Sequence, residues 1–192
     1  MTAASTEAAW TDEARERQAA NLLGALTLAL SDRLEGAATA ASRLSLSDAA
    51  ALSALHQFLD APRVDLLAQV LGLSSSGTVR LVDRLVGAGL ARRATSRDGR
   101  VTSVALTAPG RRRAESVGRS RLTLFDEALD ALTPEERRQL GELTGKVLAG
   151  LVRPPGATRW TCRLCDLDVC GRAEGHCPTY ESAKARYGAN KG

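Results

Sequence analysis

The chain has 192 residues, of which 44% are hydrophobic and 25% charged, an ordinary composition for a soluble protein with a substantial core. Aromatic residues make up only 3%, so the core must be built from Leu, Val and Ala, which favours close-packed helices over a β-sandwich. No apolar run reaches about 18 residues and the N-terminus lacks a signal-peptide layout, which argues against a membrane or secreted protein and predicts a cytoplasmic one.

The first long helix is predicted over residues 13–43, after a flexible N-terminus over residues 1–12. Its leucines fall on or near one face, at Leu22, Leu23, Leu26, Leu30 and Leu34. Such a helix has too little partner surface within its own chain, so we expect it to pair with a second copy. Ser45 or Ser47 is expected to cap the next helix, over residues 48–59.

Two short helices are predicted next, joined by a turn that contains Gly72. Residues 64–71 carry helical apolar spacing, and Gly72 ends that helix. Ser74 offers an N-cap hydroxyl for a second helix that continues to Val86. Two helices connected in this way form a helix-turn-helix, the minimal unit that inserts one helix into the major groove of DNA.

A β-hairpin is predicted to follow, because Asp98-Gly99 is a strong two-residue turn signal. Ala108-Pro109-Gly110 is then expected to form a break before a helix from Arg111 to about Leu132. Thr133-Pro134 is a helix start, with a capping hydroxyl followed by Pro at the first helical position. The last helix is expected to stop at a linker over residues 153–159.

Positive charge is concentrated around the predicted second helix and hairpin. Residues 80–113 contain nine arginines and two aspartates, a net charge of +7, whereas the whole chain carries only +4. Arginines gathered on a helix face and a hairpin are typical of a surface that binds phosphates, although charge runs are usually only solvated surface. Together with the helix-turn-helix pattern, this concentration predicts DNA binding.

The early turns of the second helix are expected to face base edges, through Ser75, Ser76, Thr78 and Arg80. Arg84, one turn further on, is predicted to meet a phosphate. Arg97 and Arg100 flank the hairpin turn and are expected to reach the adjacent minor groove. The triple Arg111-Arg112-Arg113 is open to two interpretations, contact with the DNA backbone or simple exposure to solvent.

The order and spacing of these segments resemble the MarR family of winged-helix regulators. The resemblance is carried by Leu71-Gly72-Leu73-Ser74, Val82-Asp83-Arg84-Leu85, Gly89-Leu90-Ala91-Arg92-Arg93, Asp98-Gly99-Arg100 and Leu106-Thr107-Ala108-Pro109-Gly110. It implies a mainly α fold with a small β-wing, over residues 13–152. It also implies long dimerisation helices, a homodimer that recognises a pseudo-palindromic operator, and a repressor relieved by a small-molecule effector or by oxidation.

The resemblance gives Asp98 a further role, that of a wing aspartate which orients nearby Arg side chains. The ordinary turn chemistry of an Asp-Gly pair is an equally good explanation.

All four cysteines lie in the C-terminal segment over residues 160–192, which the resemblance does not cover. Cys162, Cys165, Cys170 and Cys177 have the spacing C-x2-C-x4-C-x6-C. Clustered cysteines in a DNA-binding protein indicate a metal centre, because the cytosol keeps paired thiols reduced. Zn²⁺ is favoured slightly. An iron–sulfur cluster is the alternative, because the run of cysteines ends in Cys177-Pro178. A thiol switch is the third possibility.

A bound metal would supply the folding free energy that this short segment lacks. Its apolar side chains are then expected to pack against the dimerisation helices, through Trp160, Leu164, Leu167, Val169 and Tyr180. His176 is a weak ligand candidate, because the four cysteines already complete a set.

An enzyme is not expected, because the sequence offers no Ser-His-Asp set and no Gly-rich phosphate loop, and a four-thiolate site has no open position for catalysis. The alternative from another class is a protein-interaction adaptor, in which the winged helix and a structural zinc segment bind protein without specific DNA binding.

Overall fold

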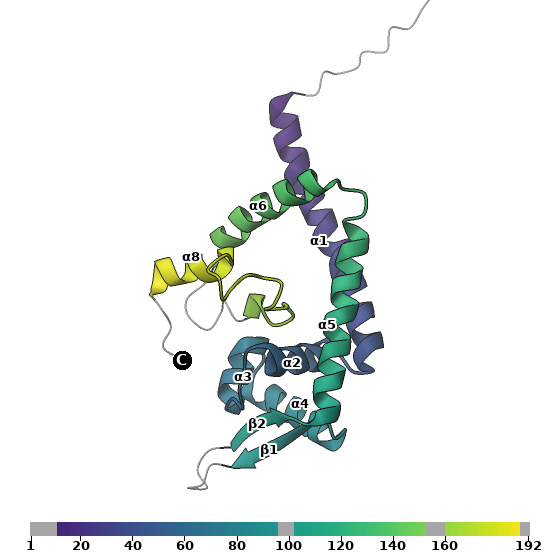
Figure 1. Cartoon of the computed structure of the whole chain (residues 1–192), viewed down its shortest axis with the longest axis vertical. Helices are drawn as coiled ribbons and strands as arrows, with labels where there is room; N and C mark the ends of the chain where they lie inside the picture. The colour runs from purple at the N-terminus through teal and green to yellow at the C-terminus, as the bar shows by residue number, and fades with distance from the viewer. Residues whose placement is uncertain (1–10, 96–101, 153–159, 189–192) are drawn as a thin grey trace, which may run out of the picture.

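The computed structural model describes residues 11–95, 102–152 and 160–188 (Figure 1). In chain order the elements are α1 (Asp12–Ser42), α2 (Leu46–Gln57), α3 (Val64–Leu71), α4 (Ser75–Gly87), β1 (Ala91–Thr95), β2 (Thr102–Leu106), α5 (Ala108–Ala128), α6 (Pro134–Gly150) and α8 (Pro178–Tyr187). Within the described ranges the only sheet is the antiparallel pair β1–β2. The predicted fold class, mainly α with a small β-wing, is confirmed.

Local hydrogen bonds explain where most helices begin. The Ser74 hydroxyl accepts the Gly77 N–H at 3.1 Å, and Ser45 rather than Ser47 caps α2 by accepting the Asp48 N–H at 3.2 Å. Thr133 and Glu136 form a reciprocal capping box at the start of α6. At the end of α3, Gly72 adopts the left-handed conformation with φ of 66°, which a side chain would disfavour.

The start of α5 differs from the prediction. Ala108-Pro109-Gly110 is the first turn of this helix and not a break, because Thr107 caps it and accepts the Gly110 N–H at 3.1 Å. Pro109 is tolerated there because the first turn needs no intrahelical N–H donors. The same Thr107 donates its hydroxyl to Gly89 O at 2.7 Å and its N–H to Leu90 O at 3.0 Å. These bonds fix the start of α5 to the segment that leads into β1.

The main hydrophobic core, in the lobe formed by α2, α3, α4 and the wing, surrounds α2. Residues 48–55 are buried without interruption, and α2 contacts α1, α3, α4, α5 and β2. The largest fully buried side chains of this core come from four elements, α2, α3, α4 and β2: Leu52, Leu67, Val70, Leu81, Val82, Leu85 and Val104. The wing is held against it by an ordered register in which Ala91 pairs with Leu106, and by the Val104 N–H, which donates to Pro62 O at 3.0 Å.

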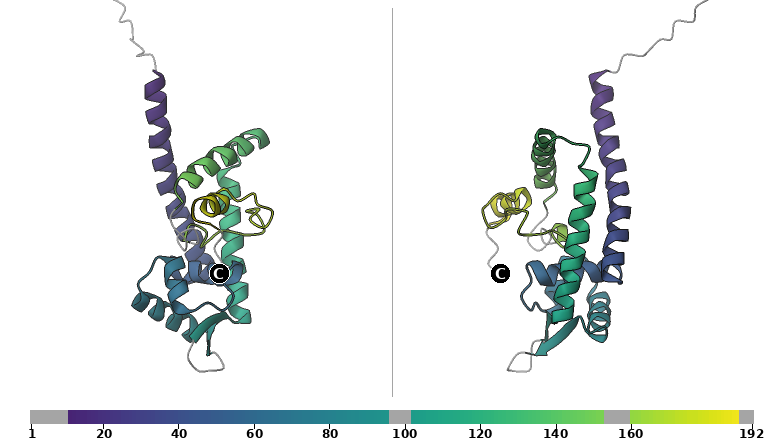
Figure 2. Two further views of the ribbon diagram at one scale, coloured as in Figure 1. Left: turned by 90° about the vertical axis from the view of Figure 1, so that its left-hand side faces the viewer. Right: turned by 45° about the vertical axis from the view of Figure 1, so that its right-hand side comes forward.

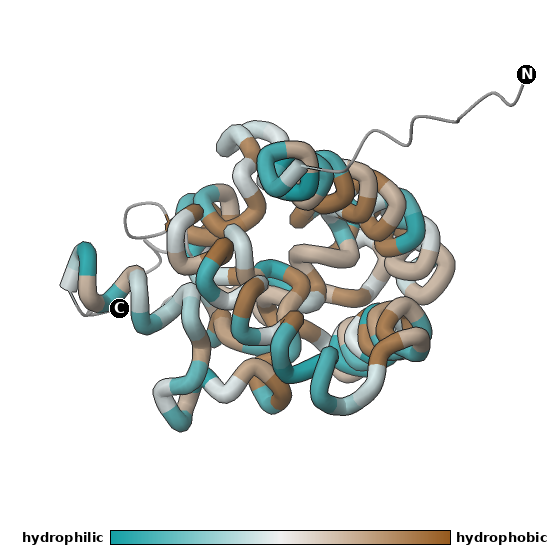
Figure 3. The backbone as a smooth tube through the Cα atoms, turned by 90° about the horizontal axis from the view of Figure 1, so that it is seen from above, coloured by the Kyte–Doolittle hydropathy of each residue, from teal (hydrophilic) through white to brown (hydrophobic). Residues whose placement is uncertain are grey.

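Two long helices extend away from this core. α1 and α5 lie side by side, and the first turns of α1 project beyond the rest of the chain (Figures 1 and 2). Figure 3 shows hydrophobic and hydrophilic stretches alternating along the helices, as expected for amphipathic elements. None of the described helices combines the length and the hydropathy that a membrane crossing requires.

The sequence-based interpretation missed α8. This helix begins at Pro178, with Glu181 in its first turn and Lys184 and Arg186 in its last turn, in favourable positions for the helix dipole. It packs on α6, where the Ser182 hydroxyl donates to Ala149 O at 3.0 Å. The C-terminal segment therefore has packed helical structure of its own.

Substitutions at two glycines of α5 test the contact that fixes its first turn. A Cβ at Gly110 would lie 1.9 Å from the backbone oxygen of Leu90, whereas a Cβ at Gly118 would meet nothing within 4 Å. We expect Gly110→Ala to lower the free energy of unfolding by at least about 1–3 kcal/mol, because the backbone must shift. The matched control Gly118→Ala should raise it by about 0.5–1 kcal/mol.

Denaturant unfolding followed by circular dichroism measures both changes. If Gly110→Ala were as stable as the wild type, the close packing of α5 against Leu90 would be contradicted.

Candidate DNA-binding surface and cysteine cluster

The helix α4 has one buried and one exposed face. Leu81, Val82 and Leu85 are fully buried against the core. The opposite face is exposed to solvent and carries Ser75, Ser76, Val79, Arg80 and Asp83. The structure therefore brings together three of the four residues predicted to face base edges, Ser75, Ser76 and Arg80, near the N-terminus of α4.

Thr78, the fourth of these residues, requires a correction. Its side chain is fully buried, and its hydroxyl donates to Ser74 O at 3.0 Å, so it is not available to a ligand from solvent. The spacing contained this signal, because Thr78 precedes Leu81, Val82 and Leu85 by three, four and seven residues and so shares their face. Val79, although apolar, is 40% exposed and lies beside Arg80.

Arg84 is held by a buried partner. Its Nη2 lies 2.8 Å from Asp48 Oδ1, and the Asp48 side chain is only 4% exposed. Asp48 also accepts the Ser45 hydroxyl at 2.7 Å. Half of Arg84 remains exposed, but its guanidinium joins α4 to the first turn of α2 and so helps to position α4.

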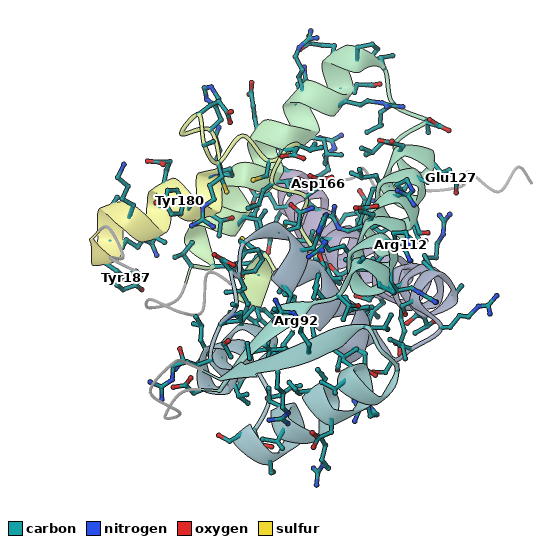
Figure 4. All side chains as sticks on the ribbon, turned by 60° about the horizontal axis from the view of Figure 1, so that its bottom comes forward. Arg92, Arg112, Glu127, Asp166, Tyr180 and Tyr187 are labelled. Atoms are coloured by element: carbon teal, nitrogen blue, oxygen red, sulfur yellow. The ribbon has the colours of Figure 1, made fainter. Side chains whose placement is uncertain are left out.

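The wing is joined to α4 in a similar way. Arg93 Nη2 lies 2.7 Å from Asp83 Oδ1 across the gap between β1 and α4. Arg92 is exposed on the same strand, and Figure 4 shows it beside the sheet. The predicted wing-tip residues Arg97, Asp98 and Arg100 lie outside the residues that the structure describes.

The three arginines at the start of α5 have separate surroundings. Arg113 Nη1 donates to Ser42 O at 2.8 Å, where α1 ends, and Arg111 Nη1 donates to Leu106 O at 3.3 Å. Arg112 is exposed and points away from the helix in Figure 4. Neither interpretation of this triple holds for Arg113, because its side chain joins α5 to the C-terminus of α1.

The four cysteines lie close to one another beside α2 and α5. None forms a disulfide, and Cys162 and Cys177 are buried while Cys165 and Cys170 are partly exposed. Cys162 and Cys165 form one pair of neighbouring thiols and Cys170 and Cys177 a second, as their effects on the pKa values of Cys165 and Cys170 indicate. The Cys165 thiol donates to Thr161 O at 4.0 Å and the Cys170 thiol to Leu167 O at 3.7 Å. The ionisation of Cys162 also depends on Cys177, and that of Cys170 on Cys165, so the two pairs are neighbours.

The interaction between Cys162 and Cys165 shifts the pKa values of these two thiols in opposite directions. The hydrogen bond from Cys162 is the main cause that lowers the pKa of Cys165 to about 6, with help from the guanidinium groups of Arg121 and Arg163. The same bond, together with burial, raises the pKa of Cys162 well above its ordinary value. Desolvation raises the pKa of Cys170. Of this pair, Cys165 is therefore the thiol whose pKa is shifted toward the thiolate, the form that binds metals.

The cluster is not a closed ligand set as it stands. Within residues 11–95, 102–152 and 160–188, no group of three or more His, Cys, Asp or Glu side chains has the arrangement of a metal site. The donors themselves fit Zn²⁺, because four thiols are neighbours and two of them are buried.

The apolar side chains of the C-terminal segment differ in their surroundings. Leu164 packs against two clusters of buried residues, one around α2 and one formed by Ala38, Ala49 and Val117. Tyr180 instead carries the guanidinium of Arg172, 4.2 Å from its ring centroid. Val169 is 69% exposed and does not pack against the long helices of its own chain.

A small cavity lies where α2, α5 and the cysteine segment meet. Its volume is about 210 Å³, and its lining includes His56, Gln57, Arg119, Cys165 and Asp166. Pockets for small-molecule effectors commonly have volumes of about 300–1,000 Å³. The expected effector therefore stays a prediction, and the cavity as described suits only a small polar molecule or water.

Comparison with solved structures gives the fold a family context. The chain is similar to a MarR family protein from Bacillus stearothermophilus, with 23% identity, a TM-score of 0.64, and coverage of 73% of this chain and 98% of that one. It is also similar to RV1404 from Mycobacterium tuberculosis, with 28% identity, a TM-score of 0.60, and coverage of 68% and 91%.

A third similar structure contains a nucleic acid. It is a mutant of the Staphylococcus aureus protein MepR bound to an oligodeoxyribonucleotide, with 18% identity, a TM-score of 0.53, and coverage of 69% of this chain and 96% of that one. No protein-family model and no curated protein matches the sequence. The architecture, the exposed face of α4 and these similarities together assign the chain the winged-helix fold of MarR-type transcription regulators.

Proposed function

We propose that this protein is a homodimeric transcription regulator that binds double-stranded DNA through α4 and the wing. One observation carries the proposal. The first turns of α4 present Ser75, Ser76, Val79 and Arg80 to solvent, while the opposite face of the helix is locked into the core. A helix held in this way exposes hydrogen-bonding groups, one apolar side chain and a guanidinium at the end that enters a major groove.

Each exposed residue of this face suits a feature of DNA. Arg80 can pair with the O6 and N7 atoms of a guanine, and Val79 can contact a thymine methyl group. Ser75 and Ser76, at the N-terminus of the helix, suit a phosphate or a base edge. Arg92, together with Arg97 and Arg100 of the hairpin, would contact the DNA backbone and the minor groove, and Asp98 would orient those arginines.

A second copy of the chain is the proposed occupant of two apolar surfaces. Leu22, Leu23 and Leu26 are half-exposed on the projecting part of α1. Four further positions form a stripe on α6, at Leu140, Leu143, Val147 and Leu151. Apolar side chains repeated at helical spacing on the terminal helices favour helix pairing between two protomers. Pairing there would place two copies of α4 for the two half-sites of a palindromic operator.

We further propose that Cys162, Cys165, Cys170 and Cys177 bind one Zn²⁺ ion per chain. The proposal is supported by the proximity of the four thiols and by the burial of two of them beside the core. Binding would release the thiol protons to solvent and fix the segment in its folded form. An iron–sulfur cluster is the competing occupant of the same four ligands.

MepR and PA3341, two proteins with similar structures, are transcription regulators, and we propose no catalytic role for this chain. We propose that the protein represses transcription, as its resemblance to the MarR family implies. A protein-interaction adaptor is distinguished by the salt dependence of binding, because counterion release makes only the DNA complex weaken steeply as salt rises.

The DNA-binding face is tested with Arg80→Ala. On duplexes selected from a random pool by the wild type, we expect the variant to bind about 5- to 150-fold more weakly, the effect of losing about 1–3 kcal/mol of base contact. Arg186→Ala, which removes the same charge from the exposed end of α8, should leave affinity unchanged. Fluorescence anisotropy at several salt concentrations measures both, and equal affinities for the two variants would contradict the assignment of α4.

The dimer is tested with Leu26→Glu, which places a charge in the apolar face of α1. We expect the variant to sediment as a monomer at concentrations where the wild type is a dimer, because a buried unpaired carboxylate opposes association. Ser31→Glu adds the same charge on a different side of the same helix and should stay dimeric. A wild type that sediments as a monomer would refute the proposed interface.

The metal centre is tested by elemental analysis and an absorption spectrum of protein purified without air. We expect a colourless protein with one zinc per chain, Cys162→Ser without zinc, and His176→Ala with zinc retained. A brown protein containing iron and sulfide would show that the four cysteines hold an iron–sulfur cluster and not zinc. Protein without metal would remove the metal centre and leave the thiols as candidates for a disulfide switch.

A further inference from the structure

The cysteine segment touches the turn of the helix-turn-helix through Trp160. A Cβ placed on Gly72, in the turn between α3 and α4, would lie 2.9 Å from Trp160 Nε1 and 3.0 Å from Trp160 Cδ1. The indole therefore rests directly on the backbone of this turn. Arg163 holds the indole, since its guanidinium lies 4.3 Å from the ring centroid and its Nη1 donates to Trp160 O at 2.7 Å.

The residues that make this contact belong to the turn that carries the first two thiols. The Arg163 N–H donates to Trp160 O at 3.4 Å and the Cys165 N–H to Cys162 O at 2.9 Å, so residues 160–165 form one continuous turn. From this turn Leu164 packs into the core between α2 and α5. A ligand that joined Cys162 and Cys165 would therefore fix Trp160 and Leu164 at the same time.

A second anchor lies between the two cysteine pairs. The Leu167 N–H donates to Gln57 Oε1, at the last residue of α2, at 3.1 Å. The cysteine segment thus contacts the C-terminus of α2 and the turn between α3 and α4, from which α4 begins.

We propose that Trp160 is a positioning residue that couples the four-cysteine site to DNA affinity. With a metal bound, the turn over residues 160–165 is fixed, Trp160 stays on Gly72, and α4 is held in the orientation that binds DNA. When the metal leaves, this support is released and the population with α4 correctly placed falls, which lowers affinity. The inference rests on the proposed function, because it requires both a metal at the cysteines and DNA at α4.

Two equilibrium comparisons test the coupling. Full-length wild type and Trp160→Ala are each compared in the zinc-loaded form and after removal of zinc by a chelator under reducing conditions, on a duplex selected by the wild type. We expect zinc removal to weaken wild-type binding by at least about 5-fold, the lower end of typical coupling between sites. Zinc-loaded Trp160→Ala should bind as weakly as the zinc-free wild type, with no further loss on zinc removal.

Tyr187→Ala is the matched control, because it truncates another partly exposed aromatic residue of the C-terminal segment, in α8. This variant should keep the wild-type affinity and the wild-type response to zinc. If Trp160→Ala behaved like Tyr187→Ala, or if zinc removal left wild-type affinity unchanged, the coupling would be overturned.

A spectroscopic measurement covers the case in which Trp160→Ala folds poorly. The chain contains two tryptophans, so Trp10→Phe leaves Trp160 as the only one. Its emission should shift to longer wavelength on zinc removal as the indole leaves Gly72, and unchanged emission would overturn the coupling. Protein that takes up no zinc, or that selects no duplex, also overturns it, and elemental analysis and the selection identify which part of the proposed function has failed.

Discussion

Close packing around α2 is the constraint on which the rest of the molecule depends. This helix is buried from Asp48 to Leu55, and four of its positions are alanines, at Ala49, Ala50, Ala51 and Ala54. Small side chains allow several neighbours to approach one helix closely, which a chain with few aromatic residues needs in order to fill its core. The one carboxylate in this buried stretch, Asp48, is satisfied by Ser45 and Arg84, so burial and the placement of α4 are linked at a single residue.

Local sequence rules predicted most of the winged helix and failed where tertiary contacts decide. Capping residues and Gly72 placed the boundaries of α3, α4 and α6 correctly, because those signals act within one turn. The three-residue segment Ala108-Pro109-Gly110 was interpreted as a break because it contains Pro and Gly. In the structure Gly110 is needed for the approach of Leu90 O, a contact that separation along the chain conceals.

At the proposed DNA-binding surface, too, local sequence signals were sufficient for some features and tertiary contacts decided others. Periodicity identified α4 and its position in the fold, but Thr78 was assigned to the wrong face, because its polarity was given more weight than the phase set by Leu81, Val82 and Leu85. The pairing of Arg84 with Asp48 and of Arg113 with Ser42 O could not be predicted, since each joins residues brought together only by folding. The cysteine spacing indicated a shared site, yet nothing in that spacing shows that residues 160–167 bridge α2 and the α3–α4 turn.

The junction between α5 and the wing has a mechanical consequence. Thr107 and Gly110 fasten the first turn of α5 to Gly89 and Leu90, so α5 and the wing form one stiff body rather than two parts connected by a hinge. At about 1.5 Å of rise per residue, its 21 residues make a lever of about 30 Å. Each degree of tilt at the far end of this lever displaces the wing end by about 0.5 Å, against a spacing of about 34 Å between half-sites one helical turn apart. Small changes in the angle between paired protomers would thus be converted directly into a mismatch with the DNA helical repeat.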